Sequence, residues 1–236
     1  MRVLRILHKW LGLIVGLQIL LWTVSGLVFA WLDHEAVAAE RSLRQPPQPV
    51  ISEDARLLAP EGLLDEYGST EILDITLMPV HENWVYRVRL ADRVELRRAE
   101  NGASFAIGER LIRDLATAHY AGDGELRAVS FHSTPTIEAR GAGAVWQAAF
   151  DDPERTSLYF SAEDGRFVAA RNESWRLFDF FWMLHTMDYR GRDNFNHPLV
   201  ILFATGALWL GIAGAILLYP SFRSARRLDS GPGSRA

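Results

Sequence analysis

The chain has 236 residues, of which 49% are hydrophobic and 23% are charged, and its formal net charge is −4. Two stretches, residues 11–32 and 199–219, contain no charged side chain. A helix of ~20 apolar residues crosses the ~30 Å hydrocarbon layer, so this distribution argues against a soluble protein. The absence of cysteine excludes disulfides, iron–sulfur clusters, thiolate metal sites and a cysteine nucleophile.

The first apolar stretch follows a basic segment, residues 1–10, and is expected to form a transmembrane helix over residues 11–32. A buried core helix is one alternative, but a second stretch of the same kind leaves too little chain to surround both. A secretory signal peptide cleaved near residues 36–38 is another alternative. The apolar stretch exceeds the ~7–15 residues of a signal core, which favours the transmembrane helix.

Charge also predicts the topology. Residues 33–198 carry 28 acidic and 18 basic side chains, whereas residues 1–10 and the tail, residues 220–236, are basic. Basic residues favour the cytoplasmic side of a membrane. We therefore expect a bacterial inner-membrane protein with both termini in the cytoplasm and residues 33–198 in the periplasm. The acidic charge of that segment argues against nucleic acid as a partner.

The segment after the first helix is rich in proline, so residues 33–51 are expected to be a linker. Residues 52–174 are expected to form a periplasmic domain. Its helices are predicted at residues 52–67, with Ser52 as N-cap, and at residues 108–120. The second of these helices is expected to bury one stripe, which consists of Leu111, Leu115 and Ala118.

Alternating apolar and polar residues between turn signals predict strands in this domain. The strands are expected at residues 72–80, 84–90, 94–99, 126–133, 144–150, 157–161 and 166–171. An aromatic segment, residues 175–198, is expected at the membrane interface, where tryptophan is favoured, and docking under the domain is the alternative. Residues 199–219 then form the second predicted transmembrane helix.

The predicted helices and strands follow in the same order twice, which indicates an α+β domain of two repeats. Residues 85–90 align with residues 145–150 at an offset of 60, and the turn at residues 99–102 aligns with residues 162–165 at an offset of 63. These turns contain Asn-Gly and Asp-Gly, which are typical of hairpins. Three side chains are expected to be buried and three exposed: Trp146, Phe150 and Leu158, and Arg87, Arg89 and Arg98, respectively.

Residues 158–167 form an aromatic–aliphatic strand that ends in an acidic residue and glycine, and they resemble the strand pair of PepSY domains. Residues 6–13, Ile-Leu-His-Lys-Trp-Leu-Gly-Leu, resemble the start of the first helix in PepSY-associated membrane proteins. Residues 184–189 resemble the segment that enters their final helix. The resemblance implies two PepSY-like units, each a helix plus an antiparallel sheet, between two transmembrane α-helices. Larger relatives with four helices include siderophore-linked iron reductases, which makes haem b the implied cofactor.

Four histidines lie near the ends of the predicted transmembrane helices: His8, His34, His185 and His197. Neutral imidazole ligates haem iron, so all four are candidate haem ligands. The family resemblance points first to His8 and His185. Twenty-two helical residues separate His8 from the other three by roughly 33 Å, so His8 cannot share one haem with them. His197 adjoins Pro198 and is alternatively a helix cap.

Each predicted transmembrane helix also carries a stripe of small residues. The stripes consist of Gly12 and Gly16 on the first helix and of Ala207, Gly211 and Ala215 on the second. Such stripes leave room for a porphyrin beside His8, or they let another helix approach closely. Besides membrane lipid, we expect a protein partner or a second copy of the chain at these positions.

The sequence contains no phosphate-binding glycine loop, nucleophile elbow or paired-histidine zinc helix, so no catalytic residue is predicted. His81, His119 and His132 are expected to be ordinary surface or core residues. The first hypothesis is a non-enzymatic interaction or regulatory module. The second is a b-type haem component of electron transfer or ferric-siderophore reduction, and the third is a structural subunit of a membrane complex. Only the second hypothesis makes the chain part of an enzyme.

Overall fold

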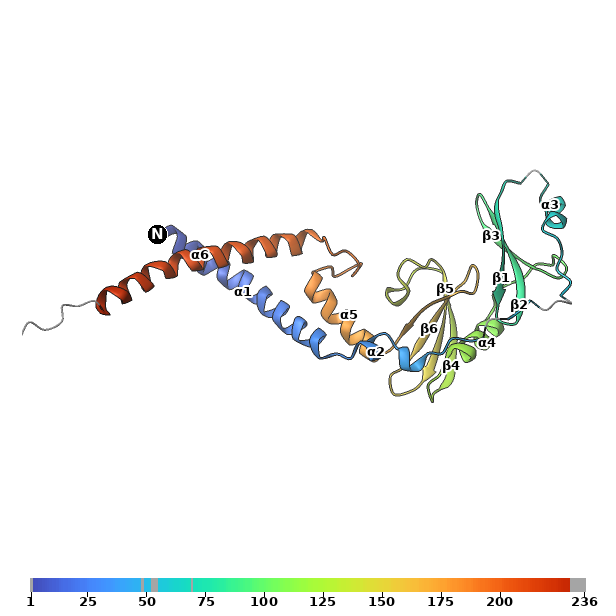
Figure 1. Ribbon diagram of the computed structural model, residues 1–236, viewed down its shortest axis with the longest axis horizontal. Coiled ribbons are helices and arrows are strands. Elements are labelled where there is room, and N and C mark those ends of the chain that lie inside the picture. The colour runs from blue at the N-terminus through green and yellow to red at the C-terminus, as the bar shows by residue number, and fades with distance from the viewer. Residues whose placement is uncertain (1, 48, 52–54, 69, 230–236) are drawn as a thin grey trace, which may run out of the picture. The chain divides into compact units, whose positions relative to one another are not determined.

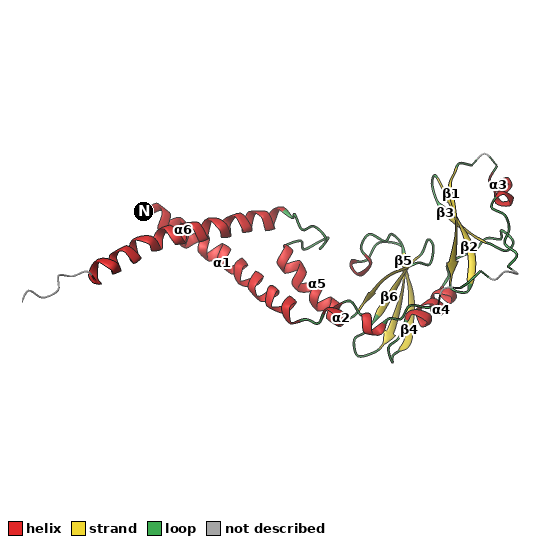
Figure 2. Cartoon of the chain, viewed as in Figure 1, coloured by secondary structure: helices red, strands yellow, loops and turns green. Residues whose placement is uncertain are grey.

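The computed structural model describes residues 2–47, 49–51, 55–68 and 70–229 (Figures 1 and 2). It divides into two compact units. The membrane unit comprises Met1–Leu32 and Leu177–Ala236, and the sheet unit comprises Asp33–Arg176. The predicted class is confirmed at this level, because two antiparallel sheets accompany two long apolar helices, one at the N-terminus and one near the C-terminus.

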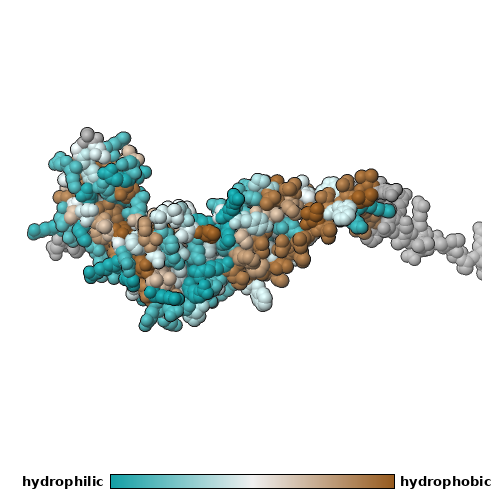
Figure 3. Space-filling model, turned by 180° about the vertical axis from the view of Figure 1, so that it is seen from behind, coloured by the Kyte–Doolittle hydropathy of each residue, from teal (hydrophilic) through white to brown (hydrophobic). Residues whose placement is uncertain are grey.

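The membrane unit is built on α1 (Arg2–Trp31) and α6 (Pro198–Asp229). Their apolar spans, Arg5–Trp31 and Pro198–Tyr219, have mean hydropathies of 2.1 and 2.2 and are long enough to cross a membrane. Figure 3 shows apolar side chains gathered over the helices of this unit. Both helices continue past the predicted charge-free stretches, since the flanking arginine and lysine are good helix formers.

Glycines bring α1 and α6 into close contact. A Cβ at Gly206 would lie 3.1 Å from the side chain of Val15, and one at Gly214 would lie 3.4 Å from Cε1 of His8. A Cβ at Gly12, between these contacts, would also touch α6 at 4.0 Å. Along these contacts the residue numbers increase on α1 and decrease on α6, so the two helices pack antiparallel.

The contact face of α6 differs from the predicted stripe. Leu210 is buried, whereas Gly211 and Ala215 are exposed. Nothing lies within 4 Å of a Cβ built on Gly211 or on Gly16. Helical spacing cannot distinguish between two adjacent rows of small residues, and the row with Leu210 and its glycine neighbours faces α1. Of the predicted stripe, Ala207 is half-buried, and Gly211 and Ala215 face away from α1.

A third helix, α5 (Glu173–Thr186), is followed by a loop of residues 187–197 that leads into α6. The buried carboxylate of Asp188 orders this loop. It accepts hydrogen bonds from the backbone N–H groups of Arg190, Gly191, Asp193 and Asn194. Trp182 of α5 donates from Nε1 to the carbonyl oxygen of Arg192 at 3.0 Å. The predicted aromatic segment is therefore a helix closed by a polar loop.

The sheet unit contains two antiparallel sheets. The first has the order β1-β2-β3 and consists of β1 (Ile72–Val80), β2 (Asn83–Leu90) and β3 (Val94–Arg98). The second has the order β4-β5-β6-β7 and consists of β4 (Glu125–His132), β5 (Val145–Asp151), β6 (Ser157–Ser161) and β7 (Phe167–Arg171). The predicted strands are confirmed within one residue at each end. Helix α3 (Glu61–Tyr67) accompanies the first sheet and α4 (Glu109–His119) the second.

Each sheet buries apolar side chains against its helix. Leu63 of α3 packs with Tyr86 and Val88 of β2. Ile112 of α4 packs with Phe160 of β6, and both side chains are fully buried. Burial of an apolar side chain of this size contributes roughly 1.5–3 kcal/mol, so these contacts fix each helix on its sheet.

The buried stripe of α4 is shifted from the prediction. Ile112, Leu115 and Ala116 are buried, whereas Leu111 and Ala118 are only half-buried. The helix thus presents a face turned by about one position, because Leu111 also contacts the core of the first sheet and is shared between the two.

Six side chains were predicted to be either buried or exposed, and two of these predictions are wrong. Trp146 is half-buried rather than buried, because it packs against the exposed ring of Phe131, with ring centroids 5.2 Å apart and planes tilted by 52°. Arg87 is half-buried rather than exposed, and its Nε is covered. The other predictions are confirmed: Phe150 and Leu158 are buried, and Arg89 and Arg98 are exposed.

The two glycine turns have the same backbone hydrogen bond. The N–H of Gly102 donates to the carbonyl oxygen of Arg98 at 2.8 Å, and the N–H of Gly165 donates to that of Ser161 at 2.9 Å. Both glycines have φ of +72°, a left-handed conformation that strains other residues. The offset of 63 residues therefore joins two turns of the same geometry.

The predicted linker is wrong over its first part. Residues 33–44 contain α2 (His34–Val37) and η1 (Glu40–Ser42), and Leu43 forms a β-bridge with Tyr120. The guanidinium of Arg44 donates to the carbonyl oxygens of Thr117 and Ala118 at 2.8 and 3.0 Å. Arg44 therefore caps the C-terminus of α4, and this segment belongs to the sheet unit.

The first predicted helix of the domain begins later than expected. It starts at Glu61, directly after Pro60, and the predicted N-cap Ser52 lies outside the described residues. The N–H of Leu58 donates to the carbonyl oxygen of Ala99 at 2.7 Å. Its own carbonyl oxygen accepts from the hydroxyl of Tyr86 at 2.6 Å. These bonds hold the preceding backbone away from the helical conformation.

Candidate functional site

The four candidate haem ligands lie in different surroundings. His185, near the end of α5, bonds to another side chain, because its Nδ1 lies 2.7 Å from Oγ of Ser25 on α1. Ser25 is completely buried, and its Oγ lies 2.8 Å from the carbonyl oxygen of Leu21. The same Oγ lies 3.1 Å from the carbonyl oxygen of Trp22. A hydroxyl has one hydrogen, so when Ser25 donates to these carbonyls its Oγ accepts from a protonated Nδ1 of His185.

The direction of this hydrogen bond depends on the tautomer of His185. When Nδ1 carries the proton, Nε2 of the neutral ring keeps a lone pair. Such second-layer hydrogen bonds are how proteins orient histidines toward a metal. The ring of Phe29 lies 5.6 Å from that of His185 and limits its rotation.

In the same region, side chains of α1 donate hydrogen bonds to backbone carbonyl oxygens at the end of α5. Nε1 of Trp22 donates to the carbonyl oxygen of His185 at 2.8 Å, and Nε2 of Gln18 donates to that of Leu184 at 3.4 Å. The sequence prediction did not identify Gln18, Trp22 or Ser25. Their spacing of i, i+4 and i+7 inside an apolar stretch places them on one helix face, and that pattern is a readable signal.

His8 lies far from this cluster. A rise of ~1.5 Å per residue places it about 26 Å along α1 from Ser25. Its ring packs over Gly214, and its buried Nδ1 has no hydrogen-bond partner within the described residues. The structure therefore keeps His8 and His185 apart, as the helix length predicts.

The remaining two candidates have other surroundings. His34 is exposed and belongs to the sheet unit, where it follows the N-cap Asp33 of α2. Nδ1 of His197 accepts from the N–H of Leu199 at 3.4 Å, which is the geometry of the predicted helix cap. In the described ranges, no group of three or more His, Asp or Glu side chains is arranged to hold a metal ion.

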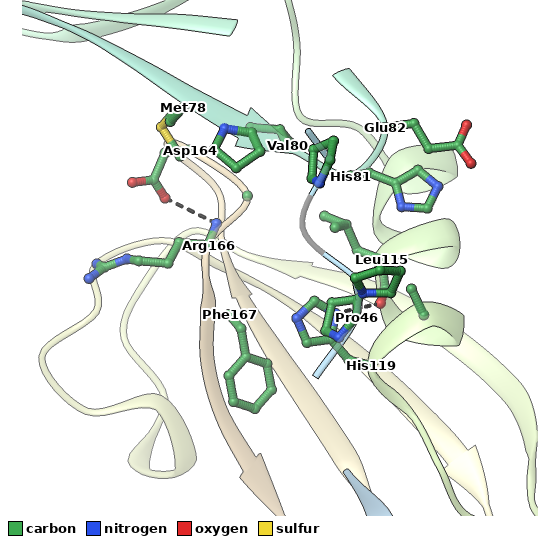
Figure 4. Close-up of a pocket in the computed structure, with 15 residues that line it drawn as sticks. Pro46, Met78, Val80, His81, Glu82, Leu115, His119, Asp164, Arg166 and Phe167 are labelled. Atoms are coloured by element: carbon green, nitrogen blue, oxygen red, sulfur yellow. Dashed lines mark hydrogen bonds between the residues drawn. The ribbon is translucent and has the colours of Figure 1, made fainter. Parts of the chain in front are cut away.

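A cavity of about 560 Å³ lies in the sheet unit (Figure 4). Its walls come from the proline segment around Pro46, the β1–β2 hairpin around Val80, the helix α4 and the turn before β7. His119 of α4 and Phe167 of β7 form a stacked pair on one wall, with ring centroids 5.3 Å apart and planes at 12°. The cavity is therefore largely apolar with a flat aromatic wall.

His119 adds one polar atom to this wall. Its Nδ1 lies 2.8 Å from the carbonyl oxygen of Leu115, so Nδ1 carries the proton. Burial lowers the pKa of His119, and the charge of nearby His81 lowers it further, against the opposing effect of the Leu115 hydrogen bond. The ring is therefore neutral at pH 7, with Nε2 as an acceptor. The sequence prediction treated His119 as an ordinary residue, since nothing in its spacing indicates a cavity.

A polar cluster of Glu138, Tyr159 and Arg176 stabilises the region around β6. The carboxylate of Glu138 accepts from the hydroxyl of Tyr159 at 2.7 Å and from Nε of Arg176 at 2.8 Å. Burial raises the pKa of Glu138, but the hydrogen bonds from Arg176 and Tyr159 outweigh it and leave the pKa below its usual value. Burial and the same carboxylate raise the pKa of Tyr159. The cluster is thus an ionised carboxylate with satisfied donors, and its role is structural.

Comparison with known proteins gives one family. Neither the curated proteins nor the solved structures contain a match to the chain. The family model described as "PepSY-associated TM region" matches residues 5–236, which include α1, both sheets and α6. The resemblance seen in the sequence is thereby confirmed across nearly the whole length. The chain belongs to the PepSY-associated transmembrane family.

Proposed function

We propose that this chain is a membrane-anchored, non-enzymatic interaction module whose sheet unit binds an apolar segment of a partner protein. The observation that supports this function is the cavity of about 560 Å³ beside His119 and Phe167. Its volume lies within the ~300–1,000 Å³ of typical binding pockets. An apolar side chain of the partner would occupy the aromatic wall, and a donor beside it would meet Nε2 of His119.

In this proposal the two sheets are two PepSY-like repeats. The second strands in the two sheet orders, β2 and β5, are the two segments that the offset of 60 aligns. The matching turns at Gly102 and Gly165 support the same alignment. The cavity draws its walls from both repeats, so a bound segment would contact both.

The orientation is part of the proposal. The basic segments lie at the termini and the acidic excess lies in residues 33–198, which favours cytoplasmic termini and a periplasmic sheet unit in the bacterial inner membrane. A periplasmic sheet unit would meet its partner outside the cytoplasm.

Two neighbouring positions on α4 test the cavity. Ala118 lines the cavity, whereas Thr117 beside it is exposed and does not line it. A photo-crosslinking residue at position 118 should give a defined adduct in cells, and the same residue at position 117 should not. Ala118→Trp, which fills the space, should abolish the adduct formed from Met78 on the opposite wall, while Thr117→Trp leaves it intact. Equal crosslinking from both positions would contradict the proposal.

A second candidate function is supported by the hydrogen bond between His185 and Ser25. With the proton on Nδ1, Nε2 of His185 has the form required of an axial ligand to b-type haem, the cofactor that the family resemblance implies. Bound haem would supply one-electron transfer, as in electron-transfer chains or ferric-siderophore reduction. His8 cannot be the second ligand of the same haem in one chain, because it lies about 26 Å along α1 from Ser25, the partner of His185.

The absorption spectrum decides this second candidate. Protein purified after expression with ample haem should show a haem band, which His185→Ala should remove and which His34→Ala, at an exposed position, should retain. A colourless wild-type protein would eliminate intrinsic haem binding and leave the interaction module.

A further inference from the structure

The membrane unit contains one helix that is too short to cross a bilayer. From Leu177 onward, α5 lies against the C-terminal half of α1. Phe178 packs against Phe29 with ring centroids 4.9 Å apart and planes tilted by 44°, while His185, farther along α5, contacts Trp22 and Ser25. Positions rise on α5 as they fall on α1, so α5 runs antiparallel to α1, back toward the middle of the transmembrane helix.

Protein groups bond part of the C-terminal backbone of α5. The carbonyl oxygens of Leu184 and His185 accept from Gln18 and Trp22 of α1. In the loop that follows, the carboxylate of Asp188 accepts from four backbone N–H groups. A helix end can enter hydrocarbon only when its free backbone groups find partners within the protein, and these bonds supply such partners.

The outer face of α5 is apolar and uncovered. Leu177 and Phe180 are 46% and 48% exposed, and the half-buried Leu184 continues the same face at i+7. The side of α1 that faces away from α5 is also apolar, since Leu20 and Leu27 are 58% and 66% exposed. Both helices thus expose apolar side chains of the kind that contact lipid.

We propose that α5 beyond Leu177 is a membrane-inserted half-helix. It descends into the leaflet at the C-terminal end of α1, and its outer face contacts lipid acyl chains. Leu177 lies nearest the headgroups and Leu184 lies deepest. A helix that lies flat in the interface, or one that is covered by protein or water, would not produce this gradient of depth.

Site-directed spin labelling can measure the gradient because the chain has no cysteine. The full-length protein in lipid vesicles would carry a single label at Leu177→Cys, Phe180→Cys or Leu184→Cys. Collision with oxygen, which partitions into hydrocarbon, is compared with collision with a water-soluble nickel chelate. The reference positions are Leu202→Cys and Leu208→Cys on α6, both more than half exposed, and Leu73→Cys on β1.

We expect the ratio of oxygen to nickel collision to increase from position 177 through 180 to 184. Position 184 should approach the values at positions 202 and 208, and position 73 should behave as an aqueous site. Equal ratios at the three α5 positions would show a flat interfacial helix and overturn the proposal. Ratios near that of position 73 would show a helix outside the lipid and would also overturn it.

Discussion

The Glu138 cluster allows a quantitative test of the sheet unit. Tyr159→Phe keeps the aromatic ring but removes the hydroxyl that donates to Glu138 at 2.7 Å. Tyr159 is 2% exposed, so water cannot replace the lost donor. A hydrogen bond to a charged group contributes about 1.5–3 kcal/mol, and we expect the free energy of unfolding of the sheet unit to fall by that amount.

The assay is pulse proteolysis of the full chain in detergent across a urea series, with cleavage within the sheet unit as the readout. Tyr67→Phe is the matched control, because its hydroxyl donates to Glu95 over a longer 3.1 Å and Tyr67 is less deeply buried, at 8% exposure. We expect the control to cost under about 1 kcal/mol, as the longer bond is weaker and Glu95 keeps hydrogen bonds from Arg93 and Arg97. Equal losses for the two variants would refute the reasoning from burial.

The cluster also predicts a pH dependence. The pKa of Glu138 is lowered in the folded state, so its stabilising contribution is complete above the ordinary carboxyl value of 4.5. That contribution is lost as the pH falls through the lower folded-state value. The difference between wild type and Tyr159→Phe should therefore be largest near pH 7 and shrink in acid. A difference that grows as the pH falls would contradict the ionised state of Glu138.

Three further predictions concern the core, the topology and the helix surface. Phe160→Ala should destabilise the sheet unit by about 3–5 kcal/mol because Phe160 is fully buried, whereas Phe131→Ala, at a position 53% exposed, should cost under about 1 kcal/mol in the same assay. A reporter active only in the cytoplasm should work when it is fused after Ala236, and activity of a periplasm-specific reporter there would refute the topology. Gly211→Leu should shift the mass of the detergent-solubilised protein toward a single chain if a second copy packs there, while Leu208→Met should not, and an unchanged oligomer would exclude that surface.

Local patterns were sufficient to predict most of the sheet unit. Period-two alternation set the strands, and glycines with positive φ fixed the turns at Gly102 and Gly165. The segment of residues 33–44 could not be predicted in this way, because its structure depends on contacts with residues 117–121, far along the chain. Its polar residues, and the prolines that follow it at positions 46, 47 and 49, indicate a linker when those contacts are unknown.

The candidate site was predicted less well for the same reason. Histidines near the helix ends could be found by inspection, but the bond between Ser25 and His185 joins residues 160 positions apart. The pairing of His119 with Phe167 likewise depends on how α4 packs on the second sheet. The face of α6 that packs on another helix could not be predicted from α6 alone, because Gly206 and Ala207 are both small and lie side by side. The contact with α1 was needed to identify it.

The early segment that docks on the second sheet affects the order in which the protein can fold during synthesis. Ala36 is held by the side chain of Asn172, a partner synthesised 136 residues later. The first sheet pairs β1 with β2 and β2 with β3, which are neighbours in the chain, so its contacts are local. They can form before Asn172 is available to bond Ala36. Chains that stall after β3 would therefore carry a folded first sheet beside an unpaired segment of residues 33–44. Closing the second sheet is then the step that completes the unit, and it cannot occur until Asn172 has left the ribosome.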